Sequence, residues 1–175
     1  MKILITGGTY GLGQNIKELL ISNGHTVEVF GSLDSYTHTL PNIINNFDVF
    51  INNEYKDLLQ TELFEYVFNE WKYNQKTIIN ILTSALVFGG TNKKYIDDKR
   101  SLEAKTFQLR SEDKEVRVIN VYPNTLESSK LIPYQKLKYS DVSNTIQWLL
   151  ELPHEIEIFQ IGISKTKLKI ETSII

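Results

Sequence analysis

The 175-residue sequence has no cysteine, only three histidines and no long apolar run. Without cysteine the chain can form no disulfide, no thiolate nucleophile and no cysteine-ligated metal site. His25, His38 and His154 are scattered and lack the spacing of a metal-binding set. No apolar run reaches the roughly 18 residues of a membrane-spanning helix, and the first residues are typical of a strand rather than of a signal peptide. These features predict a cytoplasmic protein that binds neither a metal nor a membrane.

An excess of charge of one sign is also lacking. The 19 Lys and Arg residues nearly balance the 21 Asp and Glu residues, which leaves a net charge of -2. A chain without a basic excess has no electrostatic basis for binding nucleic acid. The hydrophobic share of 41% and the charged share of 23% are ordinary for a globular protein. At this length we expect one domain that spans residues 1–175.

The sequence does contain a strand, a glycine turn and a helix at its start. The apolar run 3–5 is short and branched, which is typical of a strand buried on both faces. After Gly13 the apolar residues follow helical spacing, at Ile16, Leu19, Leu20 and Ile21. Asn23 and Gly24 then end the helix.

Three glycines of this turn suit the binding of a dinucleotide. Gly7 permits a sharp turn off the strand, Gly11 lets the backbone approach a pyrophosphate, and Gly13 lets the helix pack closely on the strand. The helix N-terminus then offers free N–H groups and a partial positive charge to the phosphates. A glycine-rich turn without a ligand is the alternative, but it carries an entropic cost that packing alone rarely requires.

The pattern Thr6-Gly7-x-x-x-Gly11-x-Gly13 resembles the cofactor turn of the short-chain dehydrogenase/reductase family. The extended branch of that family, which includes sugar-nucleotide epimerases, would have a glycine where this chain has Tyr10. The resemblance is therefore to the ordinary short-chain branch. It implies a nicotinamide dinucleotide, bound by the glycines together with Thr9, Tyr10 and Leu12.

Segments with strand and helix character alternate along the rest of the chain. The patterns predict helices at 58–71, 95–110 and 140–150, the last capped by Ser140, and strands at 26–30, 48–53, 77–84, 115–123 and 155–163. This alternation predicts an α/β fold with a Rossmann-type, doubly wound and mostly parallel sheet. The family resemblance extends over roughly residues 2–163.

The end of strand 26–30 decides between NAD and NADP in dinucleotide folds. An acidic residue there binds the ribose 2′-hydroxyl, whereas an arginine attracts a 2′-phosphate. Ser32 stands where many NADP-preferring relatives have arginine, and a small neutral residue tolerates the phosphate. The sequence therefore slightly favours NADP over NAD. Asp34 is either the carboxylate that meets the adenine amino group in relatives or an ordinary turn residue.

The next strand and its end resemble the family segment D-x-x-x-N-N-A-G, with Asn52 and Asn53 bordering the cofactor. Glu54 and Tyr55 replace the family's Ala and Gly, and we expect this bulkier pair to narrow the wall on the adenine side. In relatives the following helix carries an Asn of the catalytic tetrad. Gln60 is the polar residue nearest to that place in this chain.

Strand 77–84 resembles the family's I-V-N-I-S-S strand, which carries the catalytic hydroxyl. Ser84 is the predicted catalytic residue, and Thr83 is the alternative. The carboxyl end of a strand in an open parallel sheet is where ligands bind. By itself, either hydroxyl could equally serve to satisfy hydrogen bonds at the strand end.

Tyr95 and Lys99 lie four residues apart and therefore share one face of the helix 95–110. A lysine ammonium near a phenol favours the phenolate and lowers the phenol pKa. Tyr95 is then suited to pass a proton to or from a substrate oxygen. The resemblance implies that Lys99 also holds the ribose hydroxyls of the cofactor.

Two further features bear on this pair. Asp97 and Asp98 stand where relatives have small residues, and we expect both carboxylates to point to solvent. A second Tyr-x-x-x-Lys match, Tyr134 to Lys138, lies in a polar loop and is treated as a coincidence of spacing.

Strand 115–123 resembles the family segment I-R-V-N-x-V-x-P-G, with Asn124 in place of the glycine. Pro123 would border the cofactor. Leu126 and Ser128 fall where relatives contact the nicotinamide carboxamide.

Together these resemblances imply an NAD(P)-dependent oxidoreductase that exchanges hydride with a carbonyl or alcohol group of a small molecule. Tyr95 would be the general acid/base, Ser84 would hydrogen-bond the substrate oxygen, and Lys99 would tune Tyr95. The departures from the family pattern leave a second possibility, a dinucleotide-binding sensor or scaffold that does not catalyse. The apolar faces of the two long helices favour a homodimer or a homotetramer.

Overall fold

At the centre of the protein lies one sheet of six parallel strands, in the order β2-β1-β3-β4-β5-β6. A computed structural model describes residues 1–31, 39–112, 114–129 and 136–165. The strands are β1 (Lys2–Thr6), β2 (Thr26–Phe30), β3 (Val49–Asn52), β4 (Thr77–Ile81), β5 (Arg117–Pro123) and β6 (Gln160–Ile163). Every neighbouring pair runs parallel, as the alternation of strands and helices predicts.

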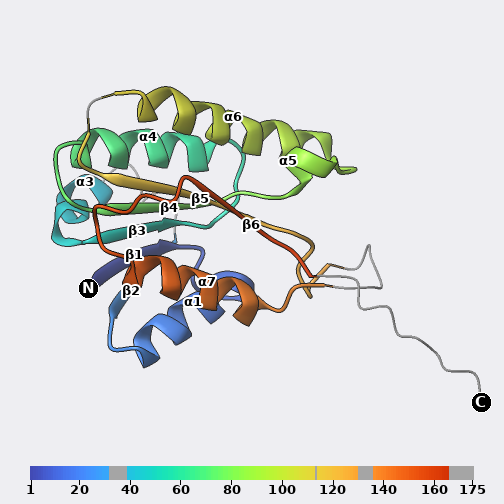
Figure 1. Ribbon diagram of the computed structural model, residues 1–175, viewed down its shortest axis with the longest axis horizontal. Helices are drawn as coiled ribbons and strands as arrows, with labels where there is room; N and C mark the ends of the chain where they lie inside the picture. The colour runs from blue at the N-terminus through green and yellow to red at the C-terminus, as the bar shows by residue number, and fades with distance from the viewer. Residues whose placement is uncertain (32–38, 113, 130–135, 166–175) are drawn as a thin grey trace, which may run out of the picture.

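Helices cover both faces of this sheet (Figure 1). They are α1 (Gly11–Ser22), α3 (Leu40–Ile43), α4 (Leu59–Trp71), α5 (Ala85–Phe88), α6 (Lys93–Arg110) and α7 (Tyr139–Glu151), with a 3-10 turn η1 (Ile44–Asn46) after α3. One face carries α4 and α6, and the other carries α1 and α7. The predicted doubly wound α/β fold is therefore confirmed.

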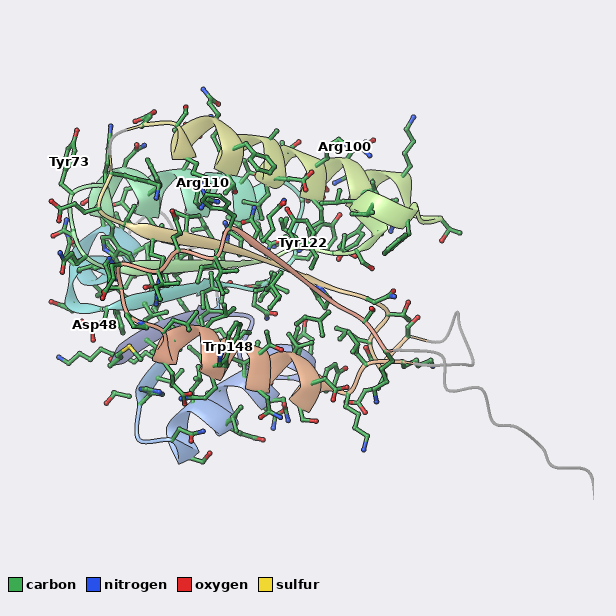
Figure 2. The ribbon with its side chains drawn as sticks, viewed as in Figure 1. Asp48, Tyr73, Arg100, Arg110, Tyr122 and Trp148 are labelled. Atoms are coloured by element: carbon green, nitrogen blue, oxygen red, sulfur yellow. The ribbon has the colours of Figure 1, made fainter. Side chains whose placement is uncertain are left out.

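Side chains fill two apolar layers between the helices and the sheet (Figure 2). Every residue of β3, β4 and β5 is buried, as expected of short runs rich in branched residues. The layer under α4 and α6 contains large aromatic side chains, among them Phe64, Phe68 and Trp71. The layer under α1 and α7 is mainly aliphatic and includes Ile16 and Leu20.

The chain reverses its direction of travel across the sheet at β1. It moves outward from β1 to β2, then crosses back to β3 on the other side of β1. In open parallel sheets, ligands bind at such a switch point, outside the carboxyl ends of the strands. The glycine turn after β1 and the segment after β3 both follow strand ends at this point.

The last strand is shorter than expected. Residues 155–159 are not part of it, and β6 begins only at Gln160. The Glu157 side chain explains the difference, because its carboxylate accepts the Val118 backbone N–H at 3.1 Å. A side chain thus takes the hydrogen bond that a neighbouring strand would otherwise make.

The start of α7 also differs from the expectation. The helix begins at Tyr139, and Ser140 does not cap it. Lys138 is the capping residue, and its backbone N–H donates to the Asp141 carboxylate at 2.8 Å. Asp141 in the first turn, rather than Ser140, therefore makes the side-chain hydrogen bond that caps the helix.

Between β2 and β3 the described chain contains only α3 and η1. In the strand order β2 is the first strand, and it therefore forms one edge of the sheet. Within the four described ranges, no helix is long and apolar enough to cross a membrane.

Candidate functional site

Each glycine of the first turn has a different role. Gly7 and Gly11 have positive φ angles of 64° and 58°, a region that favours glycine. A side chain at Gly13 would place its Cβ 2.1 Å from the Gly7 carbonyl oxygen, so glycine is required there for α1 to pack on β1. Among the described residues, a Cβ at Gly11 would meet only Tyr139, whose hydroxyl would lie 3.5 Å away. The Tyr139 ring therefore lies over Gly11 at ordinary contact distance, beside the N-terminus of α1.

The end of β1 is tied to the end of β3 by the Thr6 side chain. Its hydroxyl oxygen accepts the backbone N–H groups of Asn53 and Glu54, at 2.9 and 3.0 Å. The Asn53 amide in turn donates to the carbonyl oxygens of Thr6 and Gly7, at 3.1 and 3.3 Å. Asn53 therefore supports the turn from behind, and it also lines the cleft described next.

A cleft of about 730 Å³ lies at the carboxyl ends of the central strands. Its walls come from the ends of β3, β4 and β5, from the segment after α5 and from the N-terminal half of α6. Both members of the predicted pair, Tyr95 and Lys99, line it.

Lys99 is buried, with 3% of its surface exposed. Its Nζ donates to Gln60 Oε1 on α4 and to the Ile81 carbonyl oxygen at the end of β4, both at 2.6 Å. Burial lowers the pKa of Lys99 to about 7, because the ammonium loses its hydration. Gln60, the polar residue predicted nearest to the tetrad position, is thus in direct contact with the lysine.

Tyr95 precedes Lys99 by one helical turn. The Asn92 side chain caps α6 by accepting the Tyr95 backbone N–H at 3.1 Å. The Lys99 Nζ lies 5.5 Å from the centre of the Tyr95 ring. Burial raises the pKa of the Tyr95 phenol, and a hydrogen bond with the Thr83 side chain opposes that rise. At neutral pH the phenol is therefore protonated.

The two candidate hydroxyls after β4 have different partners. The Thr83 hydroxyl oxygen accepts the Ala85 backbone N–H at 3.3 Å and lies near enough to Tyr95 to lower the pKa of its phenol, whereas the Ser84 hydroxyl donates to Asn124 Oδ1 at 3.2 Å. Both residues line the cleft. They lie outside the strand, because β4 ends at Ile81 rather than at Ser84. The hydroxyl that acts on the Tyr95 phenol is thus Thr83, the alternative to Ser84 in the sequence-based prediction.

Tyr55, which we expected to narrow the wall on the adenine side, lines the cleft and contacts Tyr95. Its ring packs edge-on against the Tyr95 ring, with centres 4.7 Å apart. The Tyr55 hydroxyl donates to the Asp98 carboxylate at 2.9 Å. The expectation that Asp98 points to solvent is therefore wrong, since its side chain is only 12% exposed, while Asp97 is 53% exposed as expected.

A row of buried amides connects the sheet to Gln60. Asn52, Asn80 and Asn120 occupy paired positions on β3, β4 and β5, and their side chains are hydrogen-bonded in sequence at 3.0 and 3.1 Å. Asn52 also exchanges two hydrogen bonds of 2.8 Å with Gln60. Asn52 is fully buried in this row, so it positions Gln60 and does not border the cleft as predicted.

The other predicted residues divide into three groups. The first lines the cleft and comprises Leu12, Asn53, Ser84, Pro123 and Leu126. The second belongs to the described chain but does not line the cleft, and comprises Gly7, Thr9, Tyr10, Gly11, Gly13 and Ser128. Ser129 lines the cleft in place of its neighbour Ser128. The third lies outside the described residues and comprises Ser32, Asp34 and Tyr134 of the second Tyr-x-x-x-Lys match.

The residues predicted from the sequence do not include the part of the wall that is formed between α5 and α6. Phe88, Gly89, Gly90 and Thr91 line the cleft there. The paired glycines after an apolar residue are a signal for a loop, but nothing in their order indicates which way that loop faces.

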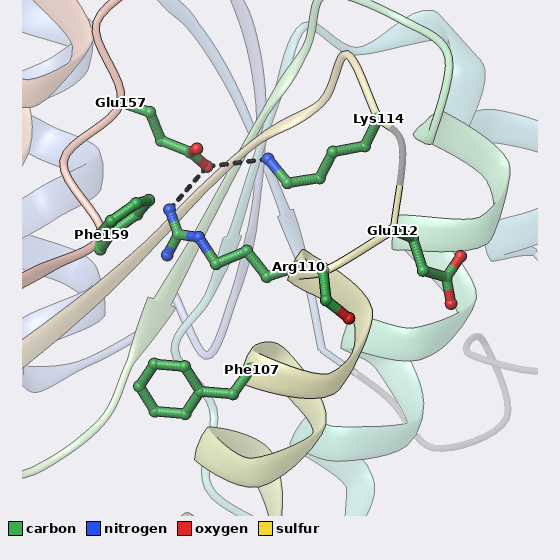
Figure 3. Close-up of a pocket in the computed structure, with 7 residues that line it drawn as sticks. Phe107, Arg110, Glu112, Lys114, Glu157 and Phe159 are labelled. Carbon is green, nitrogen blue, oxygen red and sulfur yellow. Dashed lines mark hydrogen bonds and ion pairs between the residues drawn. The ribbon is translucent and has the colours of Figure 1, made fainter.

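A second hollow, of about 540 Å³, lies at the other end of α6 (Figure 3). Arg110 and Lys114 both pair with the Glu157 carboxylate, at 3.0 Å each. The Arg110 guanidinium also lies 3.3 Å from the centre of the Phe159 ring. Arg110, Lys114 and Glu157 are therefore paired with one another and join the end of α6 to the segment before β6, while Glu112 pairs with Lys72 at 2.6 Å.

No protein-family model matches the chain, and no curated protein matches it in sequence. Solved structures do match it. Serine dehydrogenase from Escherichia coli has a TM-score of 0.74 at 18% identity, over 94% of this chain and 98% of that one. An alcohol dehydrogenase from the archaeon Thermococcus sibiricus, complexed with 5-hydroxy-NADP, has a TM-score of 0.68 at 14% identity, over 93% and 95%.

A third match is 3-ketoacyl-(acyl-carrier-protein) reductase from Brucella melitensis, complexed with NADH, with a TM-score of 0.67 at 15% identity, over 93% and 96% of the two chains. A short-chain dehydrogenase/reductase from Vibrio parahaemolyticus matches similarly, with a TM-score of 0.68. The chain therefore has the Rossmann-type fold of the short-chain dehydrogenases/reductases, as its sequence pattern implies.

Proposed function

We propose that the chain is an NAD(P)-dependent oxidoreductase of the short-chain dehydrogenase/reductase family, acting on a carbonyl or alcohol group of a small molecule. The observation that carries the proposal is the common cleft of Tyr95, Lys99 and Thr83, at the switch point of the sheet that also holds the glycine turn. The NADP and NADH ligands named for the similar structures support a nicotinamide cofactor. Ser32 favours NADP.

The residues present fit such a cofactor. The N-terminus of α1, whose first N–H groups have no side-chain cap, and the close backbone approach that Gly11 permits suit a pyrophosphate. The Lys99 ammonium has three N–H donors, of which Gln60 and Ile81 take two. The third would hold a ribose hydroxyl.

The bound nicotinamide would supply the hydride, and the chain would handle the proton. Tyr95 would give its phenol proton to the substrate oxygen during reduction and take it back during oxidation. Thr83 or Ser84 would donate a hydrogen bond to the same oxygen. Lys99 would stabilise the phenolate of Tyr95 once the proton has left, because an ammonium favours the charged form of a nearby phenol.

Replacing the phenol tests this assignment. In Tyr95→Phe we expect turnover on a carbonyl substrate to fall by about 10²-fold or more, while cofactor binding is retained. The variant keeps the ring and lacks only the hydroxyl group that transfers the proton. Turnover would be followed by NADPH absorbance, and binding by nicotinamide fluorescence. Unchanged turnover in Tyr95→Phe would rule out the mechanism.

A dinucleotide-binding sensor or scaffold is the second candidate. The burial of Lys99 beside the Tyr55 ring favours this candidate. The family pattern has glycine at this position, so the ring is an addition to the wall of the site that a catalytic relative would lack. This candidate predicts that the wild-type chain binds NADPH or NADH but turns over no member of a carbonyl panel.

We also propose that the chain is a homodimer or homotetramer. Phe107 on α6 and Trp148 on α7 are large apolar side chains that are 49% and 45% exposed. Sedimentation of the purified chain would show a multiple of the 20.2 kDa monomer mass, and a monomer mass would contradict the proposal.

A further inference from the structure

Tyr55 has an ordered place in the cleft although it stands where the family pattern has glycine. It belongs to the segment between β3 and α4. Its hydroxyl donates to Asp98, and the Asp98 carboxylate also pairs with Lys94 at 3.0 Å. Because Asp98 and Lys94 both lie on α6, these contacts attach the Tyr55 side chain to the helix that carries Tyr95.

The ring of Tyr55 is the contact that this segment makes with the proposed catalytic pair. It meets the Tyr95 ring nearly at right angles, with an interplanar angle of 79°. Its centre lies 5.9 Å from the Lys99 Nζ, and the Tyr95 ring lies 5.5 Å from the same atom on its own helix. The two phenols therefore lie side by side on one side of the ammonium.

The remaining contacts of the ammonium come from the interior of the protein. Gln60 approaches from α4 and the Ile81 carbonyl from β4. Tyr55 lines the cleft, as Ile81 does, but it is 39% exposed, whereas Gln60 and Ile81 are buried. Its ring is therefore the exposed neighbour of the ammonium in the cleft wall.

We propose that Tyr55 is a positioning residue that keeps water away from Lys99 and holds the Tyr95 ring against it. The inference rests on the proposed function for its catalytic meaning, but the contacts themselves do not depend on a cofactor. Two attachments are involved. The ring contact shields the ammonium, and the hydroxyl contact with Asp98 keeps the ring in place.

Water exclusion has a measurable consequence for Lys99. The phenol rings of Tyr55 and Tyr95 are the titratable groups near its Nζ, with ring centres 5.9 and 5.5 Å away. Its hydrogen-bond partners from α4 and β4 are a neutral amide and a carbonyl oxygen. No described carboxylate pairs with Lys99. Its low pKa therefore comes from burial, and admitting water would raise that pKa towards the ordinary 10.5.

The test is to titrate Lys99 by NMR in the full chain labelled with 13C at the lysine side chains, without cofactor or substrate. The Lys99 signal would be assigned by its loss in Lys99→Arg. We expect the pKa of Lys99 to rise by about one unit or more in Tyr55→Gly, and to change much less in Tyr55→Phe, which keeps the ring. Tyr73→Ala is the matched control, because Tyr73 is 67% exposed at the other end of the molecule from α5 (Figure 2).

An unchanged Lys99 pKa in Tyr55→Gly would overturn the proposal, as would an equal rise in Tyr73→Ala. Asp98→Asn provides a second variant if Tyr55→Gly does not fold, since it weakens the attachment of the ring while leaving the ring in the chain. We expect a smaller rise of the Lys99 pKa in Asp98→Asn, and no rise would again overturn the proposal.

The readout separates this inference from the proposed function. If Lys99 shifts as expected but the wild-type chain turns over no carbonyl substrate, Tyr55 positions the pair and the oxidoreductase proposal fails. If turnover exists, the limb of the pH profile of kcat that reports the Tyr95–Lys99 pair should also move in Tyr55→Gly and stay in place in Tyr73→Ala. A limb that does not move would overturn the positioning role and leave the oxidoreductase proposal intact.

Discussion

Gly11 is the glycine at the N-terminus of α1, where an added Cβ would lie 3.5 Å from the Tyr139 hydroxyl. Its φ of 58° already disfavours other residues, and a Cβ there would enter the space assigned to the pyrophosphate. In Gly11→Ala we expect NADPH binding to weaken by about tenfold or more, because the backbone can no longer approach the phosphates closely. The strain of the left-handed conformation should cost about 1–2 kcal/mol of stability. Fluorescence titration and urea unfolding would measure the two effects.

Gly24 offers a matched control for that substitution. Its φ is 82°, and among the described residues nothing lies within 4 Å of an added Cβ. Gly24→Ala should therefore lose similar stability but keep the NADPH affinity of the wild type. Equal weakening in both variants would mean that lost stability, rather than a blocked phosphate site, explains the result for Gly11→Ala.

The two hydroxyls after β4 can be separated by substitution. The Thr83 side chain lowers the pKa of the Tyr95 phenol, whereas the Ser84 hydroxyl already donates to Asn124. We therefore expect Thr83→Ala to reduce kcat by about 10²-fold and Ser84→Ala to reduce it less, since a lost hydrogen-bond donor to a reacting oxygen commonly costs this much. Thr83→Ser should restore most of the activity. A larger loss in Ser84→Ala would return the catalytic role to Ser84.

Residue types at the site could be predicted from the sequence, but their orientations could not. The spacing of Tyr95 and Lys99 fixes a common helix face, and the glycine spacing fixes the turn. The choice between Thr83 and Ser84 depends on where β4 ends, and adjacent hydroxyls beyond a strand carry no periodic signal. The inward position of Asp98 depends on Tyr55, which is 43 residues away in the chain.

At the scale of elements, the cap of α6 positions Tyr95. The Asn92 side chain accepts the Tyr95 N–H at 3.1 Å, which fixes the first turn of the helix. Asn92→Ala should destabilise the chain by about 1 kcal/mol, whereas Asn92→Asp, which keeps an acceptor, should cost less. Urea unfolding of the two variants checks this difference. Equal losses would show that the side-chain acceptor does not stabilise the helix.

Element types followed from hydrophobic periodicity, and element ends did not. The core strands β1 to β5 appear close to their predicted positions because their branched runs are buried. The segment 155–159 has the alternation of a strand, but the Glu157 carboxylate takes the Val118 N–H in place of a backbone partner. Such competition between a side chain and the backbone is invisible in a pattern of apolar residues.

At the scale of the whole molecule, Lys99 makes stability depend on pH. Its folded pKa of about 7 lies below the ordinary 10.5, so between these values the unfolded chain binds more protons than the folded one. The free energy of unfolding should therefore rise with pH across this window, by up to about 1.4 kcal/mol per pH unit from this group. Below about pH 7 the contribution should be flat.

Lys99→Met isolates this contribution. Loss of the hydrogen bonds to Gln60 and Ile81 changes the free energy of unfolding by the same amount at every pH. Loss of the titrating group changes how that free energy varies with pH. We expect the difference in unfolding free energy between wild type and Lys99→Met to increase from about pH 7 towards pH 10. A difference that is constant with pH would contradict the burial of an ionisable lysine.

The most direct test of the proposed function is a titration of the purified wild-type chain with NADPH and NADH, followed through nicotinamide fluorescence. We predict saturable binding of at least one of the two, with NADPH favoured, and this result would justify the carbonyl screen with Tyr95→Phe as its control. A correctly folded chain that binds neither would contradict the assignment of the glycine turn and the cleft to a nicotinamide dinucleotide.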